Sequence, residues 1–319
     1  MSSPLASPAS RRGFLLVVLA ALCWGTSGVS GKIVAERTDL GPLDIAWHRM
    51  AVGAVVLVLG YALSTRRRRS AAPVVLTRGT ALRLVLVGAG LAAYQLAYFA
   101  AVATAGVSIA TLVALGLAPL LIAVGAAVLG HGRPDRATVV ALAVALTGLV
   151  LLVGVSAGVD TGTTVILGAL MAVGSALGYA VVTLAGARVP AGIPVTLAGF
   201  AGGALLLTPV ALAVGLHSTT EPVALGVLIY LGVVPSALAY SMFFTGIRTV
   251  PGAVASIVTL LEPLTATVLA TAFLGERLAP AALAGGLLVL AAVAGLYLRR
   301  MGDSNSRGVA PNPLSKRAP

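Results

Sequence analysis

The sequence predicts an all-α integral membrane protein whose ten transmembrane helices form two inverted five-helix repeats, with both termini in the cytoplasm. Three observations predict this fold class. The composition is too apolar for a soluble domain, the apolar residues fall into ten segments, and the second half of the chain repeats the first at an offset of about 145 residues.

Composition sets the first limit. Of the 319 residues, 59% are hydrophobic and 9% are charged, against about 45–50% and about 25% in an ordinary soluble domain. A helix that crosses the hydrocarbon core takes about 20 apolar residues. Ten such helices would use most of the chain, so the length excludes a large domain outside the membrane.

The apolar segments are bounded by charges, by Pro and Gly clusters or by polar turns. In chain order they cover residues 14–31, 44–63, 81–102, 107–129, 137–155, 165–186, 194–214, 223–245, 252–274 and 281–298. They lack the alternation of a membrane β-barrel, so we expect each to be a helix. Rows of small residues, such as Gly174 with Gly178, should let these helices approach closely.

Two sequence features affect the boundaries of the first five segments. Arg11 and Arg12 resemble a twin-arginine export signal, but the chain stays apolar for nearly its whole length, so they should anchor a retained helix in the cytoplasm. The charge-free stretch 84–130 is too long for one helix. We divide it at 103–106, where small and polar residues allow a tight turn.

The last five segments repeat the first five. Ile109-Ala-Thr-Leu-Val-Ala-Leu parallels Val254-Ala-Ser-Ile-Val-Thr-Leu. Because five is odd, the second copy should enter the membrane from the opposite side, as in many secondary transporters. The predicted units are a disordered cytoplasmic N-terminus (1–12), a first repeat (13–156), an inverted second repeat (157–301) and a disordered cytoplasmic tail (302–319).

Positive charges support this topology, because cytoplasmic loops hold the excess of Lys and Arg. Of the 21 Lys and Arg, 17 fall in segments predicted inside, 3 fall in segments predicted outside, and Arg49 lies within the second apolar segment. Membrane orientation therefore explains the net charge of +12, and we expect no nucleic-acid partner. The expected location is the plasma membrane, as a multi-pass protein.

Several classes of site are absent from the sequence. Cys23 is the single cysteine, so neither an intramolecular disulfide nor a thiolate metal cluster can form. There is no phosphate-binding Gly-xxxx-Gly-Lys-Ser/Thr loop. We therefore expect no cofactor, no metal site and no catalytic residue.

Two charged residues lie inside apolar segments, where a charge costs about 2.5–3.5 kcal/mol on insertion scales. Arg49 either faces a cavity, where it can bind a substrate carboxylate or pair with Glu262, or extends to the outer interface. Glu262 is either a proton site or amine-binding group, or a neutral carboxyl that donates a hydrogen bond to a carbonyl freed by Pro263 or to one from a neighbouring helix. Their counterparts in the other repeat, Ala201 and Ala118, are uncharged. A cavity of this kind would suit a zwitterionic or amphipathic solute.

The remaining candidates are aromatic or amide side chains within apolar segments. They are Trp24, Tyr94, Gln95, Tyr98, Tyr179 and Tyr240. Tyr94 and Tyr98 share a helix face because they are four residues apart, and Gln95 corresponds to Tyr240 at the repeat offset. The rings either line a substrate pocket or pack with satisfied hydroxyls.

Three stretches carry a family resemblance. They are Ala21-Leu-Cys-Trp-Gly25 with Lys32, Pro251-Gly-Ala-Val-Ala-Ser-Ile-Val-Thr-Leu-Leu-Glu262-Pro263, and Leu274-Gly-Glu276-Arg277-Leu278. Over residues 13–298 the chain resembles the drug/metabolite transporter superfamily, in its ten-helix EamA-type branch. The resemblance implies a carrier of small metabolites, often amino acids, and usually an exporter. The first repeat departs from the pattern, since His131 replaces the acid of Leu-Gly-Glu.

We therefore expect a secondary transporter that moves an amino acid or related amphipathic solute out of the cell by alternating access. The alternative is a membrane enzyme acting on lipid-linked substrates, although the one dense cluster, at 66–69, is more simply a topology determinant or an anionic-lipid contact. A channel would need a charged ring or a filter motif. The expected partners are a small-molecule substrate and the lipid bilayer, with proton coupling and a homo-oligomer as open alternatives.

Overall fold

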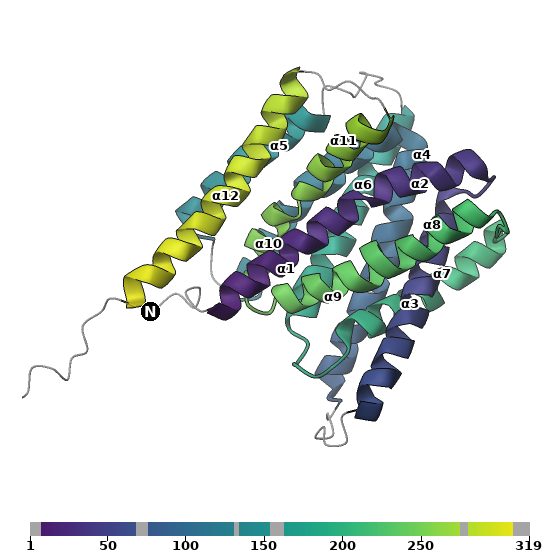
Figure 1. Cartoon of the computed structure of the whole chain (residues 1–319), viewed down its shortest axis with the longest axis horizontal. Helices are drawn as coiled ribbons and strands as arrows, with labels where there is room; N and C mark the ends of the chain where they lie inside the picture. Colours follow the sequence, from purple (N-terminus) through teal and green to yellow (C-terminus); the bar gives the residue numbers. More distant parts are fainter. Residues whose placement is uncertain (1–7, 68–75, 131–133, 154–162, 275–279, 309–319) are drawn as a thin grey trace, which may run out of the picture.

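The computed structural model describes residues 8–67, 76–130, 134–153, 163–274 and 280–308, and every regular element within them is helical (Figure 1). In chain order the elements are α1 (Pro8–Gly25), α2 (Ser27–Arg37), α3 (Pro42–Arg67), α4 (Arg78–Val128), α5 (Arg136–Val153), α6 (Thr163–Ala187), α7 (Val195–Val214), α8 (Pro222–Gly232), the π-helix η2 (Val233–Leu238), α9 (Ala239–Gly246), α10 (Gly252–Val258), α11 (Leu261–Leu274) and α12 (Pro280–Gly308). The predicted all-α class is confirmed for this part of the chain.

Six helical stretches of the described residues are long and apolar enough to cross a membrane. They are Arg11–Gly31, Leu43–Leu63, Arg78–Tyr98, Ile166–Ala187, Val195–Val214 and Pro222–Gly246. Four shorter apolar stretches are Val113–Val128, Arg136–Leu151, Gly252–Ala266 and Leu283–Arg299. Each stretch overlaps one of the ten segments expected from the sequence. The chain therefore has the helices of an integral membrane protein, while the ten crossings and the inversion of the second half stay predictions.

The third and fourth expected segments lie in one helical element, α4. The turn expected at 103–106 is wrong in form, because the helix continues through it. The chain nevertheless reverses direction within α4, since Gly90 lies against Val182 of α6 and Gly125 lies against Leu184 of the same helix. A straight helix would separate the two glycines by about 50 Å.

The reversal lies between Ala101 and Ala110, which pack together with Ala172 in one small cluster. Within this interval the Thr104 hydroxyl donates to the carbonyl oxygen of Ala100 at 2.9 Å. Hydroxyl bonds of this kind often bend helices. The small and polar residues thus mark the place of the reversal, but they turn the chain without ending the helix.

Close packing of α6 on α4 depends on Gly178, as expected from the row of small residues. A Cβ at this position would lie 2.8 Å from the backbone nitrogen of Tyr94 and 2.9 Å from the carbonyl oxygen of Gly90. Any larger residue would push the two helices apart. The expected close approach is confirmed, and it brings the ring of Tyr94 within 5.8 Å of the ring of Tyr179.

The first and eighth expected segments are irregular in the middle. Between α1 and α2 the Thr26 hydroxyl donates to the Cys23 carbonyl oxygen at 2.7 Å and accepts from the Tyr230 hydroxyl at 2.9 Å. In η2, Pro235 has no N–H to donate to the carbonyl four residues earlier. The Ser236 hydroxyl donates to that carbonyl, of Leu231, at 2.7 Å instead.

The ninth expected segment is divided into α10 and α11. Pro263 cannot donate to the carbonyl oxygen of Thr259, which accepts from the backbone nitrogen of Glu262 at 2.9 Å. The helix is therefore interrupted between Val258 and Leu261, and Glu262 lies in the first turn of α11. In each of the three irregular places the regular helical hydrogen bonds are altered, because a proline removes an N–H donor or a hydroxyl bonds a backbone carbonyl.

Helices α5 and α12 pack against each other at the edge of the bundle (Figure 1). The Asp135 carboxylate accepts from the backbone nitrogen of Thr138 at 2.9 Å, which caps α5, and pairs with Arg299 of α12 at 2.6 Å. Helix α12 continues to Gly308, so its last turns enter the segment that composition predicted as disordered. Helix α1 likewise begins at Pro8. Extending an existing helix by a few residues costs far less than starting one.

Candidate functional site

A small cavity lies between the helices and has a volume of about 30 Å³, which is room for about two water molecules. It is lined by Trp24, Ser27, Arg49, Tyr94, Leu115, Tyr179, Tyr240, Thr259 and Glu262. These residues come from α1, α2, α3, α4, α6, α9, α11 and the α10–α11 connection. Segments that are far apart in the chain therefore meet at one small, polar space.

Two of the three helical irregularities contribute residues to the cavity lining, and the third contacts one of its lining residues. Trp24 and Ser27 lie on either side of the α1–α2 interruption, and Thr259 lies at the α10–α11 interruption. The π-helix does not line the cavity itself, but it contacts Arg49, whose Nε donates to the Ser236 hydroxyl at 3.2 Å. Interrupted helices leave backbone groups unbonded, and in membrane proteins these are tolerated where they line a cavity.

Arg49 reaches inward from α3, and it does not extend to the outer interface. Ser236, its hydrogen-bond partner, is completely buried and in turn donates to the Leu231 carbonyl. A guanidinium has five N–H donors in a planar fork. The bond from Nε to Ser236 fixes the plane of the fork, and the guanidinium lines the cavity, where an anion could be bound.

Glu262 lines the same cavity from the first turn of α11. Its carboxyl lies close enough to Arg49 for their charges to interact, but no direct ion pair between them is present among the described residues. The unbonded N–H groups at a helix N-terminus also favour negative charge. The cavity therefore holds one basic and one acidic side chain that are separated by space for water or a ligand.

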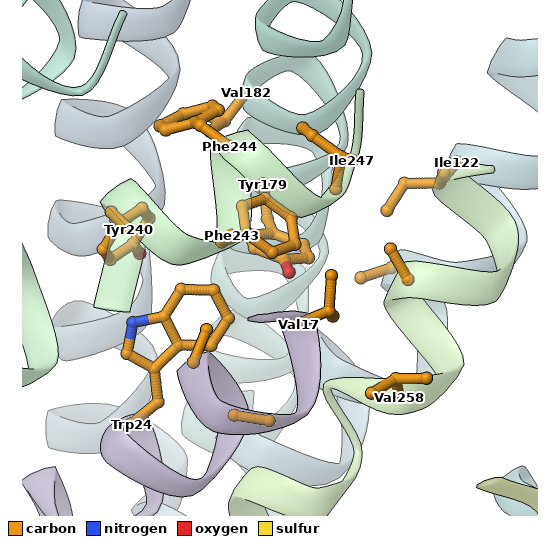
Figure 2. Packing of buried hydrophobic residues seen from close by; sticks show 14 of the residues in the cluster. Val17, Trp24, Ile122, Tyr179, Val182, Tyr240, Phe243, Phe244, Ile247 and Val258 are labelled. Carbon is orange, nitrogen blue, oxygen red and sulfur yellow. The ribbon is translucent and has the colours of Figure 1, made fainter. Parts of the chain in front are cut away.

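Aromatic rings form one wall of the cavity. The ring of Trp24 lies 4.8 Å from that of Tyr240 and 6.5 Å from that of Tyr179. Figure 2 shows these three side chains gathered with Phe243 between α1, α6 and α9. Such a wall offers ring faces to apolar or cationic groups.

Three residues that line the cavity carry a buried polar atom with no hydrogen-bond partner among the described residues. The atoms are Nε1 of Trp24 and the hydroxyl oxygens of Ser27 and Tyr179. Buried polar atoms are nearly always bonded to protein or to ordered water. Since the space next to them holds about two waters, solvent or a ligand can supply the partners.

Six of the eight residues predicted from the sequence line the cavity. They are Trp24, Arg49, Tyr94, Tyr179, Tyr240 and Glu262. Gln95 is buried but lies outside the lining, and Tyr98 stacks on Tyr94 at 6.4 Å and packs against the alanine cluster at the α4 bend. The structure thus brings most of the candidates together, while their role in substrate binding stays a prediction.

Three lining residues were missed by sequence reasoning: Ser27, Leu115 and Thr259. A hydroxyl residue close to Trp24 and another close to Glu262 were available signals for Ser27 and Thr259. Leu115 resembles every other leucine of the chain and offered none. Within the described residues, no three His, Cys, Asp or Glu side chains are close enough to hold a metal ion.

Comparison with known proteins gives a consistent result. A family profile described as the EamA-like transporter family matches the chain twice, over residues 11–154 and 165–298. The uncharacterized transporter YwfM of Bacillus subtilis (strain 168) is 30% identical over 285 residues, which cover 87% of this chain and 93% of that protein. The uncharacterized inner membrane transporter YicL of Salmonella typhimurium (strain LT2) is 26% identical over 89% of this chain and 94% of its own.

The fold also matches a solved structure. A crystal structure of a protein superposes on this chain with a TM-score of 0.74, covering 90% of this chain and 97% of the other at 22% sequence identity. At this identity the likeness concerns the fold. The two proteins share the arrangement of helices over nearly their full lengths.

Proposed function

We propose that this chain, which belongs to the EamA-like transporter family, is a secondary transporter that exports an amino acid or related amphipathic solute across the plasma membrane by alternating access. The observation that carries the proposal is the central cavity. It holds Arg49 and Glu262 together, and it lies at two helix interruptions, while a third interruption contacts Arg49.

Both halves of the chain contribute to the cavity, as alternating access requires. Arg49 and Tyr94 come from the first family match, and Tyr240 and Glu262 come from the second. If each half holds five crossings, the two halves have opposite orientations and can rock against each other around a fixed site. This rocking motion would open the same cavity first to one side of the membrane and then to the other.

The pair of charges favours a zwitterion. A carboxylate can accept two N–H bonds from Arg49, and an ammonium group can meet Glu262 or the faces of Trp24 and Tyr240. An amino acid carries both groups on one carbon, which suits opposite charges that face the same small space. An apolar side chain would lie against the aromatic wall.

Binding would replace trapped water and would need the cavity to expand. At about 30 Å³ the present cavity is too small for an amino acid. The interruptions at Thr26, η2 and Thr259–Leu260 divide long helices into shorter rigid parts. These parts can move separately, and the interruptions are the places where such a motion would bend the helices.

A binding screen followed by a flux assay tests the proposal. The purified full chain is first heated with each proteinogenic amino acid, because a ligand at 100 times its Kd adds about 2.7 kcal/mol of stability. The chain is then reconstituted alone in liposomes loaded with the amino acids that bind. We expect exchange or gradient-driven flux without nucleotide. Strict dependence on ATP and a second subunit would contradict the proposal.

A further inference from the structure

A second concave space lies away from the central cavity, between α5 and α12. It is a groove of about 610 Å³ that is walled by alanine, valine, glycine and leucine side chains. Arg136 from the first turn of α5 and Arg299 from α12 line the same groove. The groove is therefore lined mainly by apolar side chains, and Arg136 and Arg299 are its two basic residues.

Small residues create the groove. Ala141 lines it on the α5 side, and Gly295 lines it on the α12 side. A Cβ placed on Gly295 would meet no atom within 4 Å. Val140, which also lines the groove, is 62% exposed. The space thus faces the surroundings of the bundle, which for these apolar helices are the lipid chains.

The part of the groove near the two arginines carries an excess of positive charge. Arg299 pairs with Asp135, and that carboxylate also caps α5. Arg136 is exposed, has no ion-pair partner among the described residues, and lies at a helix N-terminus whose dipole adds positive potential. Two arginines and one carboxylate leave an excess positive charge beside an apolar groove.

We propose that this groove binds one acyl chain of an anionic glycerophospholipid, with the phosphate held between Arg136 and Arg299. Basic pockets between transmembrane helices bind anionic head groups in this way. The predicted topology puts both arginines on the cytoplasmic side, at the level of the inner leaflet. The site is independent of the central cavity and of the transported solute.

Charge also decides against a second copy of the chain as the occupant. A two-fold axis along the membrane normal would place the same groove of each copy at the interface. The arginines of both copies would then meet at one end, and like charges at an interface are unfavourable. A phosphate of opposite charge removes this repulsion.

Native mass spectrometry of the full chain in detergent tests the proposal, with dioleoyl phosphatidylglycerol and dioleoyl phosphatidylcholine as probes. The wild-type protein should retain phosphatidylglycerol at least fivefold better, since one basic residue near an anionic surface contributes about this factor. The variant with both Arg136→Gln and Arg299→Gln should retain the two lipids equally. The control Arg248→Gln removes an exposed arginine that does not line the groove, and it should keep the preference.

A second pair of variants tests the apolar part. Gly295→Leu should fill the groove without a clash and should reduce retention of both lipids. Gly226 is also an exposed helical glycine whose Cβ would meet nothing within 4 Å, so Gly226→Leu should retain lipid like the wild type. Inorganic phosphate at the same concentration should not displace the bound lipid.

Three results would overturn the proposal. One is equal retention of the two lipids by the wild type, and another is an unchanged preference after both arginines are replaced. The third is dimeric protein that becomes monomeric in Gly295→Leu, which would make the groove a contact between two copies.

Discussion

Arg49 and Glu262 are the residues on which the proposed transport depends most directly. A charge-assisted hydrogen bond contributes about 1.5–3 kcal/mol. We therefore expect Arg49→Gln and Glu262→Gln each to reduce transport in liposomes about 10- to 100-fold, with normal membrane insertion. Because the two charges interact across the cavity, the double variant should lose less than the product of the single losses.

Arg248→Gln is the matched control for the arginine, since it removes an exposed charge that does not line the cavity. It should transport at the wild-type rate. Full transport in both single variants at the cavity would contradict the assigned roles and leave the two side chains with structural roles only.

Gly25 shows how tightly α1 packs on α11. A Cβ at this position would overlap the Thr265 side chain and lie 2.8 Å from the carbonyl oxygen of Glu262. Gly25→Ala should therefore destabilise the protein by about 1–3 kcal/mol, measured by thermal unfolding in detergent. Gly31→Ala is the control, because a Cβ at that helical position meets nothing within 4 Å. It should be neutral or slightly stabilising, and equal effects at the two positions would contradict this packing argument.

How far the site could be predicted depends on how unusual each residue is. Arg49 and Glu262 could be found because charges in apolar segments are rare and costly. Leu115 could not, because nothing in the sequence distinguishes a leucine at a cavity from a leucine in lipid. Gln95 was chosen by its repeat position alone, and the rotation of α4 places it outside the cavity lining.

At the scale of helices, Pro235 lies in the π-helix that contacts Arg49, and its missing N–H disfavours regular α-helix there. Pro235→Ala would restore the missing N–H and favour regular α-helix, which would move Ser236 away from Arg49. We expect transport to fall about tenfold while the thermal unfolding temperature is unchanged or rises. Pro209 is an exposed proline inside α7, so Pro209→Ala should keep transport. Equal transport by the two variants would contradict a role for the π-helix.

The contact between α5 and α12 should depend on pH. Partial burial acts to raise the pKa of Asp135, but its hydrogen bonds with Thr138 and its pairing with Arg299 outweigh this effect and lower the pKa below the usual 3.8. A lowered folded-state pKa means that the stabilisation is complete above the unfolded pKa and is lost as the pH falls through the folded pKa.

The unfolding temperature should therefore decline below about pH 4 in the wild type, and this decline should be smaller in Asp135→Asn. The effect will be small, since the Asp135 side chain is 49% exposed. Asp39→Asn, which changes an exposed acid elsewhere, should leave the decline as it is. An identical fall of the unfolding temperature in all three proteins would contradict a stabilising role of the Asp135 carboxylate.

The form of the helices was harder to predict than the number of apolar segments in the chain. Pro263 and Pro235 are visible in the sequence, but a proline in a membrane helix can kink it, interrupt it or leave it almost straight. Which of these occurs depends on whether a neighbour such as Ser236 can bond the released carbonyl. The position of the α4 reversal was predicted correctly, because small residues permit a bend. Its form was not, because small residues do not determine whether the helical hydrogen bonds continue through the bend.

At the scale of the whole molecule, the distribution of positive charge predicts the topology. Single cysteines introduced into a Cys23→Ser background should react with an impermeant thiol reagent from outside sealed cells at Thr38, Asp160 and Thr220. Those at Ser70 and Ser306 should react only after the membrane is opened. The reason is that 17 basic residues mark the inside and 3 mark the outside. Labelling at Ser306 in sealed cells would exclude the ten-helix arrangement. Asp160 and Ser70 lie outside the described residues.

The presence of one acid and one base in the central cavity has an electrical consequence. With Glu262 ionised, the empty site carries no net charge, and a zwitterion adds none. Each uncompensated charge that crosses the membrane potential costs about 2.3 kcal/mol per 100 mV. With Glu262 ionised, the loaded and the empty cavity would therefore both be neutral, and the membrane potential would add nothing to the driving force for the solute. Replacing Glu262 with glutamine would leave Arg49 uncompensated and would make each step of the cycle sensitive to voltage.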